Sequence, residues 1–190
     1  RVVTYALQPF TLIGATTRAG LLTAALRSRF GIVHNIRFYD NDELTEILKQ
    51  ATMKLQMDTI DEASLQCIAS RSRGTPRIAL RLLRRVRDYS QVRCDNVINT
   101  SIVDQALELE GIDSVGLDAL DRTYLATLAG IYEGGPVGVE AIAATMGEDA
   151  GTLQDVVEPY LLQVGFLART RQGRKITILG LNQVKSYPNS

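Results

Sequence analysis

An arginine-rich segment holds the residues whose types and spacing most directly suggest chemistry. Residues 71–87 contain seven arginines and no acidic residue. Within this segment, Thr75 and Pro76 form the pattern of a helix start, because threonine can accept a backbone N–H bond as an N-cap and proline fits the first helical position. Arg77 therefore follows at a helix N-terminus, where anions are already attracted. The sequence predicts that Arg77 senses a phosphate group.

A second basic group lies near the end of the chain, where residues 166–169 and 175–178 are predicted to form two strands of a hairpin. Contact between such a hairpin and phosphates is independent of base sequence and sensitive to salt. The preceding predicted helix, residues 151–164, contains no basic residue. If this region touches DNA, the hairpin is expected to do so, through four residues: Arg169, Arg171, Arg174 and Lys175.

The first segment of the chain has the pattern of an α/β domain. Residues 10–15 are a continuous apolar run, typical of a strand buried on both faces of a parallel sheet, and Thr16 and Thr17 follow it. Open α/β sheets bind ligands at such strand ends. A short helix over 21–29 and a strand over 32–38 complete the predicted end of a parallel-sheet domain, which we assign to residues 1–42.

The rest of the chain is predicted to be mainly helical. Apolar residues recur with helical spacing from residue 41, and four predicted helices form a small bundle that we assign to residues 43–113. Residues 114–190 contain three predicted helices followed by the hairpin, an order typical of a winged-helix domain. The predicted helices cover residues 41–55, 61–72, 76–91, 100–109, 117–132, 140–146 and 151–164.

Composition excludes several classes of protein. The chain has 190 residues, of which 45% are hydrophobic, and equal numbers of basic and acidic residues, 21 each. One histidine, two cysteines and no Cys-x-x-Cys pattern argue against a zinc site, and no apolar run approaches the ~20 residues that span a bilayer. Sparse cysteine suits a reducing cytosol. Because the chain opens directly in a strand-like pattern, we expect it to be a fragment.

Four segments together give the chain a family resemblance. Residues 12–20, 26–33, 73–77 and 134–138 resemble the RuvB family, the bacterial AAA+ motors that drive Holliday-junction branch migration. The resemblance implies that the chain contains the end of a large ATPase domain, then a helical lid, then a winged-helix head. It implies ATP or ADP as cofactor, with Mg²⁺ ligands outside this chain. No G-x-x-x-x-G-K-[ST] motif is present, so the fragment alone is not expected to hydrolyse ATP.

The resemblance also implies roles for individual residues around the nucleotide. Thr17 matches the first sensor, whose hydroxyl orients the attacking water or touches the γ-phosphate. Arg29 matches an arginine finger, which reaches from one subunit into the nucleotide of the next and neutralises charge during phosphoryl transfer. Tyr39 matches a position that packs against the nucleotide, and Arg77 matches the second sensor. Taken singly, each residue also fits a structural or surface role.

The remaining expectations concern partners. In the family, the positions of Arg169 and Arg174 contact the DNA backbone, and Arg171 and Lys175 are expected to assist. The implied partners are duplex DNA at Holliday junctions, RuvA, RuvC and five further copies in a homo-hexamer, in a bacterial cytoplasm and away from membranes. Two alternatives stay open: a winged-helix DNA-binding regulator without enzymatic activity, and another AAA+ ATPase such as a clamp loader. A clamp loader normally follows its lid with a collar, which the winged-helix pattern disfavours.

Overall fold

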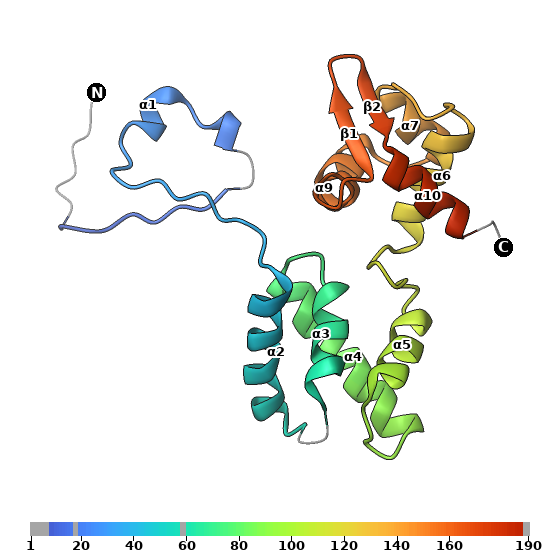
Figure 1. The fold of residues 1–190 in the computed structure, drawn as a ribbon. Coiled ribbons are helices and arrows are strands. Elements are labelled where there is room, and N and C mark those ends of the chain that lie inside the picture. The colour runs from blue at the N-terminus through green and yellow to red at the C-terminus, as the bar shows by residue number, and fades with distance from the viewer. Residues whose placement is uncertain (1–7, 17–18, 58–59, 188–190) are drawn as a thin grey trace. The chain divides into compact units, whose positions relative to one another are not determined.

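The computed structural model describes residues 8–16, 19–57 and 60–187, and the chain divides into two compact units, residues 1–37 and 38–190 (Figure 1). The first unit contains η1 (Ala19–Leu21) and α1 (Ala24–Arg27). Neither predicted strand forms among its described residues, and Ile13 is 88% exposed. A strand of a parallel sheet needs hydrogen-bonded neighbours, which the described residues of this chain do not supply.

The second unit begins with a bundle of four helices, as predicted. Apolar residues spaced three and four apart place one stripe of each helix in a shared core, in which Leu44, Leu48 and Leu82 are fully buried. Asp40 starts the first helix through a capping box with Glu43. The helices of this helical domain are α2 (Asn41–Leu55), α3 (Glu62–Ser70), α4 (Pro76–Arg93) and α5 (Thr100–Leu109).

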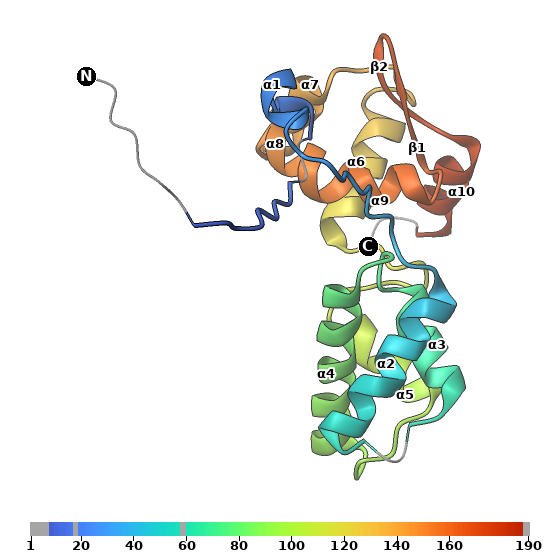
Figure 2. The ribbon, with the colours of Figure 1, turned by 90° about the vertical axis from the view of Figure 1, so that its left-hand side faces the viewer.

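A winged-helix domain follows, with a separate core around Tyr124, Leu128 and Ile142. Its third helix contains one π-helical turn before Pro159, which has no N–H to donate to the carbonyl four residues earlier. Figure 2 shows this domain and the helical bundle as separate groups of elements. The elements are α6 (Ala119–Gly130), α7 (Val139–Met146), α8 (Ala150–Thr152), η2 (Leu153–Val157), α9 (Glu158–Gln163), β1 (Leu167–Thr170), β2 (Gly173–Ile176) and α10 (Ile178–Ser186).

The hairpin is tighter than the sequence predicted. Leu167 pairs with Ile176 and Thr170 with Gly173, so only Arg171 and Gln172 form the turn. β2 also bridges to the loop before α7, where the Arg174 N–H donates to the Val137 carbonyl oxygen at 2.7 Å. Glycine is required at 173, because its φ is +136° and a Cβ there would lie 2.3 Å from the same oxygen.

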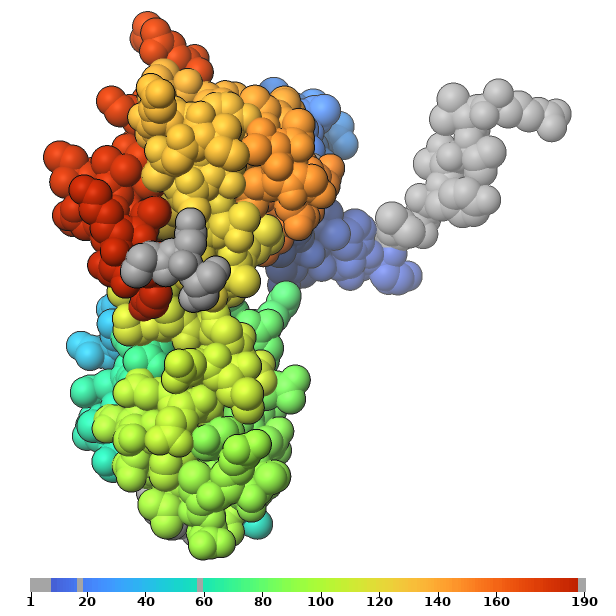
Figure 3. All heavy atoms as spheres, turned by 90° about the vertical axis from the view of Figure 1, so that its right-hand side faces the viewer, coloured from blue at the N-terminus to red at the C-terminus, as the bar shows by residue number. Residues whose placement is uncertain are grey.

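Helix α10 was not predicted from the sequence. Thr177 caps it by accepting the Gly180 N–H at 3.1 Å. Gly180 permits close packing, because a Cβ there would lie 2.4 Å from the Phe166 carbonyl oxygen. In the space-filling view, α10 (red) lies against α6 (yellow) (Figure 3). Among the helices that the structure describes, none is long and apolar enough to cross a bilayer.

Candidate functional site

The loop between α3 and α4 brings two predicted nucleotide-contacting residues together. The backbone N–H of Tyr39 donates to the carbonyl oxygen of Gly74 at 2.9 Å, just before α2 begins. Arg77 follows three residues later in the first turn of α4. Tyr39 is 40% exposed and Arg77 is exposed as well. The segment before α2 and the first turn of α4, both next to this loop, therefore present an accessible tyrosine and an accessible arginine.

Gly74 is the residue that permits this approach. Its φ is +67°, a conformation that residues with a side chain adopt at a cost. A Cβ at this position would lie 2.8 Å from Cβ of Phe38, 3.2 Å from the carbonyl oxygen of Tyr39 and 3.1 Å from Nε2 of Gln163 in α9. The loop is therefore packed between the segment of residues 38–39, which leads into α2, and the winged-helix domain.

The start of α4 is built differently from the prediction. The side chain of Thr75 does not cap the helix, so that prediction was wrong. Its hydroxyl donates to the Ser72 carbonyl oxygen at 3.3 Å, which stabilises the loop instead. Pro76 occupies the start of the helix as predicted. No ion pair involving Arg77 occurs in the described part of the chain.

The two residues predicted to be catalytic, Thr17 and Arg29, belong to the first unit. Thr17 lies outside the described residues. Arg29 follows α1, is exposed, and donates its backbone N–H to the Leu26 carbonyl oxygen at 3.1 Å. An exposed guanidinium on a short helix-turn segment suits a group that acts on another molecule.

Most other arginines of the loop and α4 make contacts within the helical domain. Arg71 reaches α5, where its Nη2 lies 2.5 Å from Oδ1 of Asp104. Arg85 pairs with Glu110 at 3.5 Å. Arg73 is an exception, because it points away from the helical domain and bonds to Gly116, Asp118 and Asp121.

At the hairpin, a buried carboxylate binds two of the predicted DNA contacts. Glu158, at the start of α9, is fully buried. Its Oε2 accepts from Nε of Arg169 at 2.9 Å, and its Oε1 accepts from Nε of Arg174 at 2.8 Å. The hydroxyl of Tyr124 donates to Oε1 at 3.0 Å. Burial raises the pKa of Tyr124, and Glu158 raises it further, so the phenol stays a donor.

The hairpin arginines and lysine are thus unequally exposed. The side chain of Arg174 is 19% exposed and that of Arg169 is 49% exposed. Arg171 occupies the turn and Lys175 the outer edge of β2, and both are exposed. Among these four side chains, Arg171 and Lys175 are therefore the most accessible to a polyanion, and Arg169 is partly accessible. Sequence spacing did not indicate Glu158, because nothing in its neighbourhood marks it as buried.

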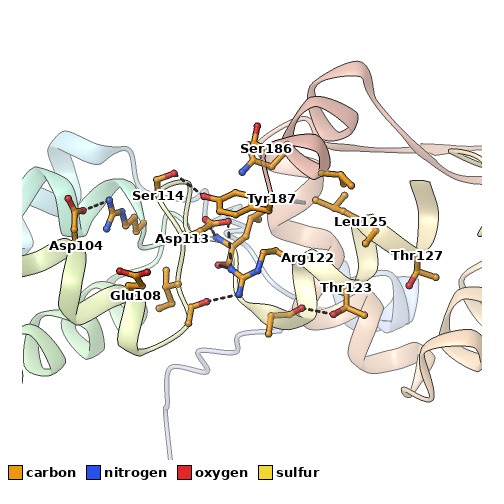
Figure 4. A pocket seen from close by; sticks show the side chains of 18 residues that line it. Asp104, Glu108, Asp113, Ser114, Arg122, Thr123, Leu125, Thr127, Ser186 and Tyr187 are labelled. Carbon is orange, nitrogen blue, oxygen red and sulfur yellow. Dashed lines mark hydrogen bonds and ion pairs between the residues drawn. The ribbon is translucent and has the colours of Figure 1, made fainter. Parts of the chain in front are cut away.

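A groove of about 850 Å³ lies where the helical and winged-helix domains meet. Arg122 spans it, donating to the carbonyl oxygens of Gly111 at 3.1 Å and Leu117 at 2.9 Å (Figure 4). The hydroxyls of Ser114 and Tyr187 are 3.3 Å apart at its rim. Across the described residues, no group of three or more histidine, cysteine, aspartate or glutamate residues could hold a metal ion.

Comparison with protein families shows three consecutive matches. The model of the Holliday junction DNA helicase RuvB P-loop domain matches residues 1–36. The model of the RuvB AAA lid domain matches residues 39–113. The model of the RuvB C-terminal winged helix domain matches residues 114–185. Each region therefore resembles the corresponding part of RuvB, in the same order.

Comparison with solved structures gives the same result. The Thermotoga maritima RuvB Holliday junction branch migration motor is 52% identical, with a TM-score of 0.88, and the match covers 96% of this chain and 61% of that one. A single-site mutant of the same RuvB is 53% identical, with a TM-score of 0.87 and coverages of 95% and 60%. The chain thus spans about three fifths of the length of these RuvB chains.

Proposed function

The chain belongs to the RuvB family, and from that premise we propose that it forms the C-terminal part of an ATP-driven DNA motor for Holliday-junction branch migration. The observation that carries the proposal is the succession of three RuvB domain matches, over residues 1–36, 39–113 and 114–185. It works as a homo-hexamer beside RuvA, with RuvC joining for resolution, in the bacterial cytoplasm. Its DNA substrate is duplex DNA next to the junction.

The residues of this chain fit one side of a nucleotide. ATP bound with Mg²⁺ supplies the free energy of the motor, and the Mg²⁺ ligands belong to residues outside this chain. Tyr39 packs against the nucleotide, and Arg77 binds its phosphates from the first turn of α4. Gly74 supports this role, because a side chain there would close the approach between the loop and Tyr39.

Three polar groups respond to the phosphates. The hydroxyl of Thr17 orients the attacking water or touches the γ-phosphate. Arg29 enters the nucleotide site of the neighbouring subunit and neutralises the charge that develops on the transferring group. Arg77 would bind the γ-phosphate of ATP and would lack this partner with ADP, so the loop before α4 would differ in position between the two states. Chemistry is thereby converted into movement of the helical domain.

On the DNA side, the hairpin binds backbone phosphates rather than base edges. Arg171 and Lys175 make direct contacts, because both are exposed, Arg171 in the turn and Lys175 on β2. Arg169 contributes from its exposed half. Arg174, which the resemblance also places on DNA, acts mainly by fixing β2 to Glu158. Contacts of this kind let the motor move along any sequence.

Arginine substitutions in the full-length protein test the ATPase role. We expect Arg29→Ala to lower DNA-stimulated ATP turnover by about 10³-fold or more while leaving ATP binding intact. Arg27→Ala is the matched control, since Arg27 is two residues away and donates to the Ala19 carbonyl oxygen at 3.1 Å. Normal turnover by the Arg29 variant would show that Arg29 is not the finger.

A salt titration tests the hairpin. Replacing Arg171 and Lys175 by alanine in the full-length protein should weaken duplex binding and reduce the slope of log affinity against log salt by about 2. Arg81→Ala with Arg84→Ala removes the same charge from the exposed face of α4 and serves as control. If the control changes the slope as much as the hairpin variant, the DNA surface lies elsewhere.

A further inference from the structure

Arg73 connects the nucleotide-facing loop to the winged-helix domain. Its Nε donates to the Gly116 carbonyl oxygen at 3.0 Å. Its Nη2 donates to Oδ2 of Asp118 at 2.9 Å and to Oδ2 of Asp121 at 2.5 Å. The guanidinium also lies over the ring of Tyr160, 5.1 Å from its centroid. One side chain of the loop thus contacts the linker, α6 and α9.

The backbone of Arg73 supports a specific role for this side chain. Its φ is +52°, a conformation that is uncommon for residues other than glycine. The side chain is only 12% exposed, although arginine is normally a surface residue. A strained backbone and a buried guanidinium at the same position show that the surrounding structure holds Arg73 in this orientation.

The partners of Arg73 are themselves fixed. Asp121 is fully buried, and its Oδ2 also accepts the Asp118 N–H at 3.0 Å, within the capping box of α6. Tyr160 is held from the other side, because its hydroxyl donates to the Val115 carbonyl oxygen at 2.6 Å. Movement of Arg73 would therefore be passed to the start of α6 and to α9.

The rest of the junction offers few alternatives to this link. In the part of the chain that the structure describes, no helix of the bundle packs extensively on an element of the winged-helix domain. The two domains have separate cores, and a groove lies between them beside Arg122. Gly74, directly after Arg73, is the point where the loop meets Tyr39 on one side and Gln163 on the other.

We infer that Arg73 is a positioning residue that couples the loop before Arg77 and α4 to the winged-helix domain, so that a change at the nucleotide reaches the DNA-binding hairpin. The inference rests on the proposed function, because it requires a nucleotide at Arg77 and DNA at the hairpin. Arg73 touches neither. The ion pair with Asp121 makes the loop, α6 and α9 move together, and the hairpin follows α9 through Glu158.

The experiment measures coupling rather than activity alone. In the full-length protein, duplex affinity is determined with ADP and with a non-hydrolysable ATP analogue, and ATP turnover is measured with and without DNA. We expect Arg73→Gln to keep turnover without DNA but to lower DNA stimulation, and the ratio of the two affinities, by about tenfold. Arg73→Lys keeps the positive charge but not the planar set of guanidinium donors, and should lower the coupling by an intermediate amount.

Arg85→Gln is the control, because Arg85 lies in the same bundle and, in the part of the chain that is described, forms its ion pair with exposed Glu110. Asp121→Asn, combined with Arg73→Gln, should add no further loss if the pair acts as a unit. A folded Arg73→Gln protein with full coupling overturns the inference, and if that variant does not fold, full coupling in Arg73→Lys does so. A wild-type protein without DNA-stimulated turnover contradicts the proposed function instead.

Discussion

Two buried carboxylates, Asp121 and Glu158, are bound by arginines in different ways. Glu158 receives two arginines and a tyrosine hydroxyl, and both of its oxygens have partners. Asp121 receives one arginine, Arg73, which comes from the other domain, and its Oδ1 has no hydrogen-bond partner among the described residues. The first acid lies inside one domain, and the second lies where two domains meet.

The surroundings of Asp121 also change its own pKa. Burial raises the pKa of Asp121 to about 6, although Arg73 opposes the shift. A carboxylate that is surrounded by donors fixes a structure, whereas one with an unsatisfied oxygen is easier to neutralise and to separate from its partner. We therefore regard Glu158 as an anchor that holds the hairpin against α9, and Asp121 as a movable contact whose ion pair with Arg73 can break when the domains move.

Matched amide substitutions test this contrast most strongly at Glu158. Glu158→Gln keeps the shape but removes the negative charge from beside Arg169 and Arg174. Because Arg174 is mostly buried, we expect the free energy of unfolding to fall by about 3–5 kcal/mol. Urea denaturation measures the change, and Glu148→Gln at an exposed position is the control. A loss no larger than that of the control would mean that the ion pairs of Glu158 with Arg169 and Arg174 contribute nothing to the free energy of unfolding.

Asp121→Asn is expected to cost less. Arg73 keeps Asp118 as a partner, and the asparagine no longer carries a buried charge, so we expect a loss of about 1 kcal/mol at pH 7. The same denaturation experiment applies. A loss equal to that of Glu158→Gln would remove the distinction between anchor and movable contact.

The pH dependence should also differ. The pKa of Asp121 is raised from 3.8 to about 6 in the folded protein, so the folded state binds this proton more tightly than the unfolded state. Its contribution to the free energy of unfolding therefore rises by about 1 kcal/mol as the pH falls from 7 to 5. Subtracting the pH profile of Asp121→Asn isolates this gain. A difference that stays constant with pH would contradict the raised pKa.

An exposed ion pair should give the smallest change in the free energy of unfolding. Arg85 and Glu110 are 3.5 Å apart with side chains 55% and 38% exposed. Solvent screens such a pair, and we expect Arg85→Gln to change the free energy of unfolding by less than about 0.5 kcal/mol. Thermal denaturation at two salt concentrations measures it. A larger effect would show that exposure is a poor guide to the role of these arginines.

Local pattern predicted the helices of the second unit well, because each must bury an apolar stripe. The stripe through Leu44 and Leu48 is a clear case, and the hairpin was placed within a few residues. The helix after Thr177 was missed, although threonine there is a capping residue. The strand predicted over 10–15 does not form, since a strand also depends on hydrogen-bonded neighbours that local pattern does not supply.

For the candidate site, too, some features were indicated by the sequence and others appeared only in the structure. The resemblance indicated Tyr39, Arg77 and the hairpin, and their roles in binding stay predictions, as do those of Arg29 and of Thr17, which lies outside the described residues. The structure adds that Tyr39 lies beside the loop of Arg77. It also shows that Arg169 and Arg174 bind Glu158, which the count of basic residues could not reveal.

The sequence by itself determined the order of the domains, the positions of most helices and the family. These features follow from periodicity, capping and short motifs, which act over a few residues. Only the tertiary structure decided which arginines are buried, because a guanidinium is held by carboxylates distant in the chain. Arg73 and Asp121 are separated by 48 residues, and only folding brings them within 2.5 Å.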